Sequence, residues 1–337
     1  MLVLGLETSC DETAAAVLKD GETLLSNIIN DQIDIHSEYG GIVPELAGRS
    51  HNERVHRVII QAVQKAGVEL RDIDLIAVTM GPGLIGSLLV GLNTAKGLSY
   101  GLKKPMIGVN HLEGHVLAIF LQKKVEFPFI ALVVSGGHTE LYRVSGFGQY
   151  KLLGKTRDDA AGECFDKVGK MLGLPYPGGP AIEKLARKGN GNAHKFPRAY
   201  LEKGSLDFSF SGLKTSIRTF LNQRRQHSSI TLTDEDISAG FQDAVLDVLV
   251  GKLISACKRE KLSRIVVTGG VASNGALREA VKKEAQCWGF EASFPDPKFC
   301  TDNAAMIACA GYYKFVGDQN SSADFKILDA KASLSVG

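Results

Sequence analysis

Apolar residues gather in short runs along the chain, and the polar residues between them predict how the first part folds. The runs Met1–Glu7, Ala14–Leu18 and Thr23–Asn30 have the length of strands and are separated by polar turns. This spacing predicts a three-stranded meander. From Arg49 to Gly67, apolar residues recur every three or four positions, which is typical of an amphipathic helix that ends at a glycine.

The second half of the chain repeats the parts of the first half in the same order. A strand-turn-strand hairpin recurs at Phe129–Val144, and a strand, a glycine turn and a helix also occur twice. The two copies of that second unit are Leu75–Thr79, Gly81–Gly83 and Leu84–Tyr100, and then Arg264–Thr268, Gly269–Gly270 and Ala272–Glu284. A duplicated α/β architecture with a cleft between its halves explains this order most economically.

The repeat divides the chain into two predicted lobes. We expect an N-terminal lobe over residues 1–110, completed by a C-terminal helix over residues 302–320. We expect a C-terminal lobe over residues 111–301, with a helical insertion at about residues 158–261. The polar stretch after Phe315 ends weakly and is expected to be partly frayed.

Composition limits the class of protein. The chain has 337 residues, of which 44% are hydrophobic and 23% charged, as in ordinary globular proteins. The net charge of +2 gives no general basic field, so a nucleic-acid partner would need a local patch or the help of another protein. The six cysteines form no C-x-x-C pair, the chain begins directly in a strand, and no apolar run reaches membrane-spanning length. We therefore expect a cytoplasmic protein without a membrane partner.

The segment His111-Leu-Glu-Gly-His115 resembles a zinc-protease motif but differs from it at one position. Two histidines four residues apart on a helix share one face and can reach one metal ion. In H-E-x-x-H the glutamate follows the first histidine and acts as the general base. Here Glu113 lies two residues after His111, about 200° around the helix. The spacing keeps the metal ligands and loses the base, although two histidines without a metal role fit the same spacing.

Asp302, which begins another predicted helix, is available as a third ligand. Two imidazoles and one carboxylate leave open coordination positions, a set that suits Fe(II) or a catalytic Zn(II). Cys300 and Cys309 are rival ligands that the sequence neither excludes nor supports.

Four tight turns rich in glycine or hydroxyl side chains follow predicted strands. Backbone N–H groups in such turns can hold phosphate oxygens. The turns are Thr8–Thr13, Gly81–Gly83, Ser135–Thr139 and Thr268–Asn274. One such turn alone usually only reverses the chain, but four in a duplicated framework favour nucleotide binding. Asp11 and Glu12 in the first turn would repel a phosphate directly, so they fit a site that acts through a metal or a positioned water; a turn-capping role for Asp11 explains it equally well.

The duplicated pattern resembles the actin-like ATPase (ASKHA) superfamily, and longer motifs resemble one family within it. Those motifs are Leu4-Gly-Leu-Glu-Thr-Ser-Cys-Asp-Glu-Thr13, Gly40-Gly-Ile-Val-Pro-Glu-Leu-Ala47, Gly81-Pro-Gly-Leu84, His111–His115, Val134-Ser-Gly-Gly-His-Thr139, Ala160–Lys167, Tyr176–Pro180, Phe208–Lys214 and Thr301-Asp-Asn303. From the first strand to about Gly311 the chain is similar to the TsaD family of tRNA adenosine threonylcarbamoyltransferases. The resemblance implies a duplicated actin-like fold with two lobes around a nucleotide cleft.

The resemblance implies an acyl transfer. Family members move the threonylcarbamoyl group from threonylcarbamoyl-AMP to N6 of adenosine 37, beside the anticodon, in tRNAs that read codons beginning with A. By resemblance, His111, His115 and Asp302 bind one divalent metal per subunit, with Fe(II) expected first and Zn(II) second. The residues expected to hold the adenylate are Val133, Val134, Ser135, Gly136, Gly137, Asp166, Gly179 and Asn274. ATP or ADP is expected to fit the same cleft, and Asp11 or Glu12 to orient or deprotonate the attacking amine.

One position departs from the family pattern. Some members carry an aspartate shortly after the Pro-Gly-Gly-Pro run, where this chain has Glu183 as a candidate substrate contact. Family members work with a TsaB-like paralogue, as a heterodimer, and with a TsaE-like ATPase. By resemblance, the helix from Arg49 to Lys65 packs on that paralogue. Candidate tRNA contacts, which a solvated basic face explains equally well, are Lys188, Lys195, Arg198, Lys214, Arg218, Arg224 and Arg225.

Three rival functions make different predictions. A metalloprotease would need a glutamate in another position and leaves the glycine turns unexplained. A small-molecule kinase or ATPase of the same fold would turn over nucleotide without needing His111 and His115. A non-enzymatic nucleotide-sensing scaffold would keep its cellular function when the metal ligands are removed.

Overall fold

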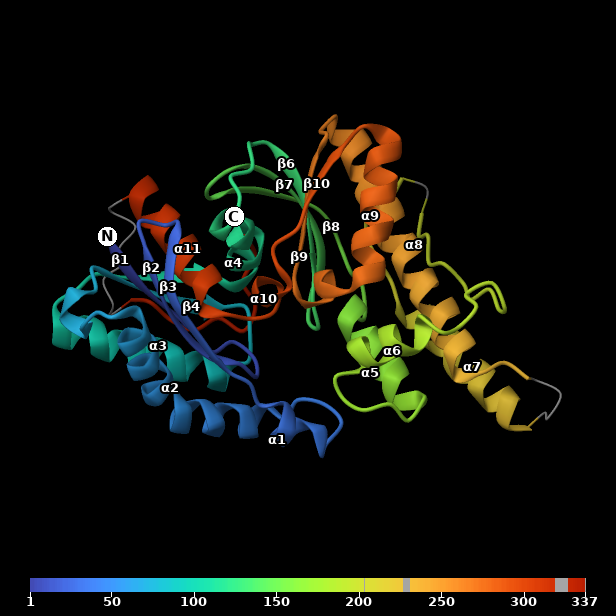
Figure 1. Cartoon of the computed structure of the whole chain (residues 1–337), viewed down its shortest axis with the longest axis horizontal. Coiled ribbons are helices and arrows are strands. Elements are labelled where there is room, and N and C mark those ends of the chain that lie inside the picture. Colours follow the sequence, from blue (N-terminus) through green and yellow to red (C-terminus); the bar gives the residue numbers. More distant parts are fainter. Residues whose placement is uncertain (203, 227–230, 319–326, 337) are drawn as a thin grey trace. The chain divides into compact units, whose positions relative to one another are not determined.

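The computed structural model describes residues 1–202, 204–226, 231–318 and 327–336, which divide into two compact units. Unit 1 comprises residues 1–127, 146–150 and 295–337, and unit 2 comprises residues 128–145 and 151–294. Within the described ranges, no helix is long and apolar enough to cross a membrane. Figure 1 shows the elements of both units in chain order.

Unit 1 is built on a five-stranded sheet with the order β3-β2-β1-β4-β5. The strands are β1 (Leu2–Glu7), β2 (Thr13–Lys19), β3 (Thr23–Asn30), β4 (Leu75–Gly81) and β5 (Met106–Asn110). The pairs β1–β2 and β2–β3 are antiparallel, which confirms the predicted meander, and β1–β4 and β4–β5 are parallel. The ends of β1, β4 and β5 therefore bring polar residues to one edge of the sheet.

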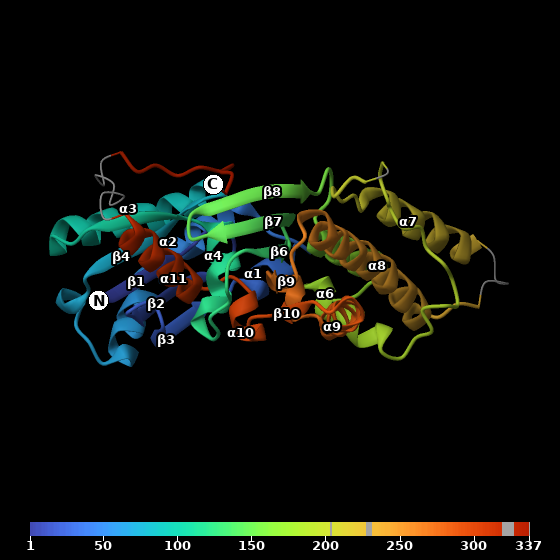
Figure 2. The same cartoon turned by 90° about the horizontal axis from the view of Figure 1, so that it is seen from above.

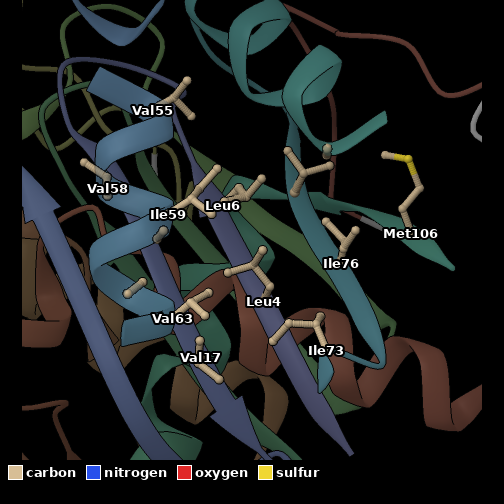
Figure 3. Packing of buried hydrophobic residues seen from close by; sticks show 14 of the residues in the cluster. Leu4, Leu6, Val17, Val55, Val58, Ile59, Val63, Ile73, Ile76 and Met106 are labelled. Atoms are coloured by element: carbon tan, nitrogen blue, oxygen red, sulfur yellow. The ribbon is translucent and has the colours of Figure 1, made fainter. Parts of the chain in front are cut away.

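Helices cover both faces of this sheet. They are α1 (Ile33–Ser37), α2 (Pro44–Ala66), η1 (Leu70–Asp72), α3 (Ile85–Leu102), α4 (His111–Leu117), η2 (Ala118–Leu121), α10 (Pro297–Cys300) and α11 (Ala304–Gly317). In Figure 3, Val55, Ile59 and Val63 of α2 lie over Leu4 and Leu6 of β1. Alternate residues of a strand point to opposite faces, so Ala14 and Ala16, which pack on Ala304 and Ala305, place α11 on the other face.

Helix α2 begins five residues before the predicted start at Arg49. Its first residue is Pro44, and Val43 before it is extended. Proline is well suited to the first turn of a helix because its missing N–H needs no partner there. The Gly-Gly-Ile-Val-Pro run therefore leads into the helix, and the start at Arg49 was wrong.

Unit 2 repeats the strand order of unit 1. Its sheet has the order β10-β9-β6-β7-β8, from β6 (Phe129–Val134), β7 (Thr139–Gly146), β8 (Gln149–Lys155), β9 (Arg264–Thr268) and β10 (Glu291–Ser293). As in unit 1, the first strand pairs antiparallel with the second and parallel with the fourth. The predicted duplication is confirmed.

Among its described residues, the predicted helical insertion contains four helices: α5 (Ala161–Met171), α6 (Gly178–Ala186), α7 (Ser211–Gln226) and α8 (Asp234–Glu260). After β9 come η3 (Gly270–Ser273) and α9 (Gly275–Trp288), which packs against the long helix α8. Both views show α8 between α7 and α9 (Figures 1 and 2). Residues 158–161 anchor the insertion, because the carboxylate of Asp158 accepts hydrogen bonds from the N–H groups of Phe210 (2.8 Å) and Ser211 (3.2 Å) at the start of α7.

The end of the chain is bound rather than frayed in its last described residues. Of the stretch predicted to fray, residues 319–326 and 337 lie outside the described part. Beyond them, the N–H of Lys331 donates to the carbonyl of Met80 at 2.8 Å, and Leu328 packs into the core of unit 1. Asn110 Nδ2 donates to the carbonyls of Leu334 (3.2 Å) and Ser335 (3.1 Å). The tail therefore lies over the ends of β4 and β5, which polarity alone did not predict.

The compact units do not follow the predicted lobes at every point. Unit 1 continues past residue 110 to Phe127 and takes up residues 295–301 as well. Helix α4 accounts for this, because it packs on α11, the C-terminal helix expected to complete the first lobe.

Candidate metal centre and nucleotide-binding turns

The helix that carries the two histidines begins directly after a buried strand. Asn110 ends β5 and caps α4, and its Oδ1 accepts hydrogen bonds from the N–H groups of Leu112 (2.9 Å) and Glu113 (3.3 Å). Such a cap fixes the direction of the first turn. His111 and His115 stand on that turn with ring centroids 4.7 Å apart, so the predicted shared face is present.

Asp302, which lies just before α11, completes a three-residue group with the histidines. Its Oδ1 lies 3.1 Å from Nε2 of His115 and 3.5 Å from Nε2 of His111. One ligand atom from each residue lies within 4.8 Å of the others. Two ligand atoms bound to one ion at about 2.1 Å lie about 3.0 Å apart in octahedral and about 3.4 Å apart in tetrahedral coordination. The two distances from Asp302 to the histidines therefore fit ligands of a single divalent metal ion.

A second layer of polar groups holds His111. Its Nδ1 lies 3.0 Å from Oε2 of Glu7 and 3.1 Å from Oγ of Ser9. Glu7 is fully buried and also accepts hydrogen bonds from the hydroxyl of Thr79 (2.6 Å) and the N–H of Ser9 (2.5 Å). An ionised carboxylate only accepts, so Nδ1 carries a proton, and Nε2, which faces Asp302, is the nitrogen that a metal ion would bind in place of a proton. Metal-binding histidines are held in this way.

The electrostatics around the histidines favour a cation. Burial alone would lower the pKa of His111, but the carboxylates of Asp302 and Glu7 raise it to about 9. Asp11 and Glu12, in the turn between β1 and β2, lie within the field of the same aspartate. Burial and the charge of Asp302 raise the pKa of both carboxyl groups, most strongly that of Glu12. This clustering of buried acids is relieved by a positive ion.

Glu113 of the histidine motif and the two rival cysteine ligands form hydrogen bonds to other groups. Oε1 of Glu113 accepts a hydrogen bond from the hydroxyl of Tyr150 at 3.0 Å, and burial raises the pKa of its carboxyl. The thiols of Cys300 and Cys309 are buried and donate to the carbonyls of Pro295 and Leu117. Among the described residues, the three-residue group contains neither Glu113 nor a cysteine. Glu113 is therefore not placed to act as the general base of a metalloprotease, as the spacing predicted.

Sequence reasoning missed the residues that support the site from neighbouring elements. Glu7 ends the apolar strand β1, and Thr79 follows four buried apolar residues in β4, so a polar residue after a buried run was the available signal. His51 of α2 gave no such signal. Its ring is buried and contacts the hydroxyl of Thr13 at 2.8 Å and the carbonyl of Cys10 at 3.0 Å. It therefore supports both ends of the Asp11–Glu12 turn.

In unit 2, the candidate phosphate turn follows β6, which ends in Val133 and Val134. The N–H of Ser135 donates to the carbonyl of His138 at 2.8 Å, and the N–H of His138 donates to Oγ of Ser135 at 3.1 Å. These two bonds close the turn. A Cβ added at Gly136 or Gly137 would meet nothing within 4 Å, so the backbone at the tip is open to a ligand.

Two glycines let neighbouring segments of unit 2 pack closely against this turn. A Cβ at Gly162, at the start of α5, would lie 2.6 Å from the carbonyl of Ser135. A Cβ at Gly269, whose φ is +93°, would lie 2.4 Å from the carbonyl of Val134. Further along α5, Oδ1 of Asp166 accepts from the N–H of Gly178 at 2.7 Å. The start of α6, which contains Gly179, is thus held beside α5.

Asn274 and Glu183 meet at the start of α9. Asn274 caps this helix through the N–H of Leu277 (2.9 Å) and donates to Oε1 of Gln242 (3.0 Å). Oε1 of Glu183 accepts from the N–H of Gly275 (3.0 Å) and from Arg187 (2.7 Å). The longer side chain that departs from the family pattern therefore reaches the α9 N-terminus.

The predicted basic candidates are partly engaged within the chain. Arg198 pairs with Asp247 at 2.9 Å, Arg224 with Asp234 at 2.6 Å, and Lys214 with Asp159. These three contacts have structural roles in unit 2, which lowers the charge that they offer to an RNA.

Comparisons of sequence identify relatives along nearly the whole chain. A sequence model of the TsaD family, described as tRNA N6-adenosine threonylcarbamoyltransferase, matches residues 23–309. A curated protein with that description from Geobacter sp. is 56% identical over 313 residues, 93% of this chain and 91% of its own length. One from Clostridium perfringens is 50% identical over 337 residues, 100% of this chain and 98% of its own length.

Comparisons of structure agree on the fold. HypF of T. kodakarensis superimposes with a TM-score of 0.63 at 14% identity, covering 94% of this chain and 48% of that one. The activator of the 2-hydroxyisocaproyl-CoA dehydratase from Clostridium difficile, solved with ADPNP, superimposes with a TM-score of 0.55 at 16% identity, covering 95% of this chain and 97% of that one. These proteins have the actin-like ATPase fold, which confirms the predicted fold class.

Proposed function

Because the chain belongs to the TsaD family, whose members are tRNA N6-adenosine threonylcarbamoyltransferases, we propose that it carries out this acyl transfer. The donor is threonylcarbamoyl-AMP, and the acceptor is N6 of adenosine 37 in tRNAs that read codons beginning with A. The observation that carries the proposal is 50% identity over the full length of the chain to a relative of that name. Fold similarity alone would not support an activity, because one fold carries many functions.

In unit 1, His111, His115 and Asp302 would hold one divalent metal ion. The donor set of two imidazoles and a carboxylate favours Fe(II), with Zn(II) as the second choice. When bound, the ion would supply a Lewis acid for the threonylcarbamoyl oxygens. Glu7 and Ser9 engage Nδ1 of His111, so Nε2 is the nitrogen that would bind the ion.

In unit 2, the turn Ser135–Gly137 would hold the phosphate of the adenylate, and its N–H groups would stabilise the charge that develops as AMP departs. Val133 and Val134 support that turn from the buried strand β6. Asp166, whose Oδ1 also accepts from the N–H of Gly178, would contact the ribose hydroxyls. Gly179 and Asn274 border the same region, and Glu183 acts there by holding Gly275. ATP or ADP would use the same residues.

The attacking amine is a weak nucleophile, so positioning carries much of the rate. Asp11 and Glu12 are the proposed residues for orienting it or for taking its proton. The raised pKa of Glu12 gives this carboxyl the basicity that a proton acceptor needs. His51 keeps the turn that carries both residues in place.

The proposed partners are tRNA, a TsaB-like paralogue and a TsaE-like ATPase, in a cytoplasmic complex. Helices α2 and α3 support the paralogue assignment, because Ile60 (51% exposed), Ile85 (49%) and Leu89 (39%) leave apolar surface on them. Exposed apolar side chains on adjoining helices are typical of a protein interface.

A transfer assay with two donors tests the proposal. The chain and its partners are incubated with unmodified tRNA and either purified threonylcarbamoyl-AMP carrying labelled threonine, or ATP alone. With the adenylate, we expect label on tRNA. With ATP alone, we expect that adding the chain does not increase ATP hydrolysis. ATP hydrolysis by the chain, without label on tRNA, would instead support the ATPase or kinase reading.

A further inference from the structure

A groove of about 650 Å³ lies on unit 2 between α8, α9 and the segment before α7. Leu246, Val250 and Ile254 of α8 line it, and each is at most 6% exposed. Two aromatic residues line it as well, and both are open to solvent: Trp288 is 51% exposed and Tyr200 is 56% exposed. The groove therefore exposes two aromatic rings to solvent, whereas the aliphatic side chains at its floor are buried within unit 2.

Lysines stand beside these rings. Nζ of Lys258 lies 3.1 Å from the centroid of the Trp288 ring, and Lys283 also lines the groove. Of the two acidic residues in the lining, Asp247 is bound by Arg198 at 2.9 Å, and its backbone carbonyl accepts from the hydroxyl of Tyr200 at 3.1 Å. Two lysines therefore face one uncompensated acid, Glu284.

This combination fits a nucleic acid better than a protein. Aromatic rings stack on bases, and lysines next to them contact the flanking phosphates. A docked protein helix would need exposed aliphatic side chains to bury, and the floor residues offer almost none. The groove thus has the chemistry of a single-strand RNA site.

We propose that this groove binds a strand of the substrate tRNA, with a base stacked on Trp288 or Tyr200 and phosphates at Lys258 and Lys283. The inference rests on the proposed function, which supplies the RNA. Helix α9 links the groove to the proposed adenylate residues, because Asn274 caps one end and Trp288 ends the other. Its 14 residues span about 20 Å, the length of about six stacked nucleotides.

Binding of fluorescein-labelled unmodified tRNA to the chain in its partner complex, followed by anisotropy, tests the groove. We expect about tenfold weaker binding for Trp288→Ala and near wild-type binding for Trp288→Phe, which keeps a ring to stack on. For Lys283→Ala, the slope of log affinity against log salt should fall by about one. The matched control is Lys19→Ala, which removes an exposed lysine of β2 outside the groove and should leave both quantities unchanged.

Trp288 is the only tryptophan of the chain, so its own fluorescence gives a second readout. Adding tRNA to the purified chain should quench it in a saturable way, because stacked bases quench indole. Tyr200→Ala should weaken the binding without removing the quenching.

Equal tRNA affinity of Trp288→Ala, Lys283→Ala and wild type would overturn the inference. So would a loss of partner assembly with unchanged tRNA affinity, since the groove would then bind a protein. These results are separate from the proposed function: if wild type modifies tRNA while the variants bind as wild type, only the groove assignment fails. If wild type forms no product on tRNA, the proposed function fails whatever the variants bind.

Discussion

Replacing Glu7 with glutamine should weaken metal binding without touching a metal ligand. Glu7 accepts three hydrogen bonds in the buried site, from Ser9, Thr79 and Nδ1 of His111. Glutamine keeps the shape and one acceptor oxygen, but it places an N–H₂ group where one carboxylate oxygen was. If that group faces His111, Nδ1 must accept, and the ring proton moves to Nε2, the atom that would bind the ion.

The size of the effect follows from the bond that is lost. A hydrogen bond to a charged group contributes about 1.5–3 kcal/mol. At 1.4 kcal/mol per factor of ten, this corresponds to a dissociation constant raised by about 10- to 150-fold. Loss of a residue that orients a metal-bound histidine typically costs about 10- to 100-fold. We therefore expect the metal dissociation constant of Glu7→Gln to rise by about 10- to 100-fold.

Competition with a chromophoric chelator measures this constant for Fe(II) and Zn(II). Glu113→Gln is the matched control, because Glu113 is also buried and lies on the histidine helix but bonds to Tyr150. Its metal affinity should stay within about twofold of wild type. If Glu7→Gln binds metal as tightly as wild type, or if both variants lose affinity alike, the reasoning about His111 is refuted.

Three further predictions concern stability. A Cβ at Gly5 would lie 2.3 Å from the carbonyl of Ala304, so Gly5→Ala should cost at least about 2 kcal/mol in urea unfolding, whereas Gly97→Ala, on an open face of α3, should be neutral or stabilising by up to about 1 kcal/mol. Removing residues from 327 onward deletes Leu328 from the core and the two carbonyls that bind Asn110, the cap of the histidine helix. The truncation should therefore lower both Tm and metal affinity. Unchanged values would show that the tail stabilises neither the core nor the metal site. Burial alone would raise the pKa of Asp158, but hydrogen bonds from Ser209, Phe210 and Ser211 lower it below its value in the unfolded chain. The ionised carboxylate therefore stabilises the fold above the unfolded-state pKa, and this stabilisation is lost as the pH falls through the folded-state pKa. Asp158→Asn should therefore lower Tm at pH 7 and differ less from wild type near pH 3, and a constant difference would contradict this.

Hydrophobic pattern predicted most of the fold, because each buried strand and amphipathic helix carries its own periodicity. The meander of β1–β3, the duplicated strand order and the insertion of α5–α8 were all predicted in this way. The start of α2 was missed because Gly40, Gly41 and Pro44 usually break helices, and only the position of the proline in the first turn reverses that meaning. The docking of the tail was missed because, apart from Leu328, the tail is held through its backbone groups, which any sequence offers.

The candidate site was predicted where its residues share a local spacing. His111 and His115 come from one helical turn, and Asp302 was proposed because it begins another predicted helix and lies in a motif that resembles the family's, Thr301-Asp-Asn303. Glu7, Thr79 and His51 reach the site from elements far apart in sequence, and no local spacing links them to it. The surroundings of Asn274 and Glu183 also needed the structure, since their partners lie on α8 and at the start of α9.

The most direct measurement of the central claim is mass spectrometry of nucleosides from tRNA incubated with threonylcarbamoyl-AMP, the partners and metal-loaded chain. Wild type should form threonylcarbamoyl-adenosine, and the double variant His111→Ala/His115→Ala should form less than about one hundredth as much, because both imidazole ligands are gone. A control tRNA with guanosine in place of adenosine 37 should stay unmodified. Equal product from wild type and the double variant would contradict the metal assignment, and no product from wild type would contradict the acyl transfer itself.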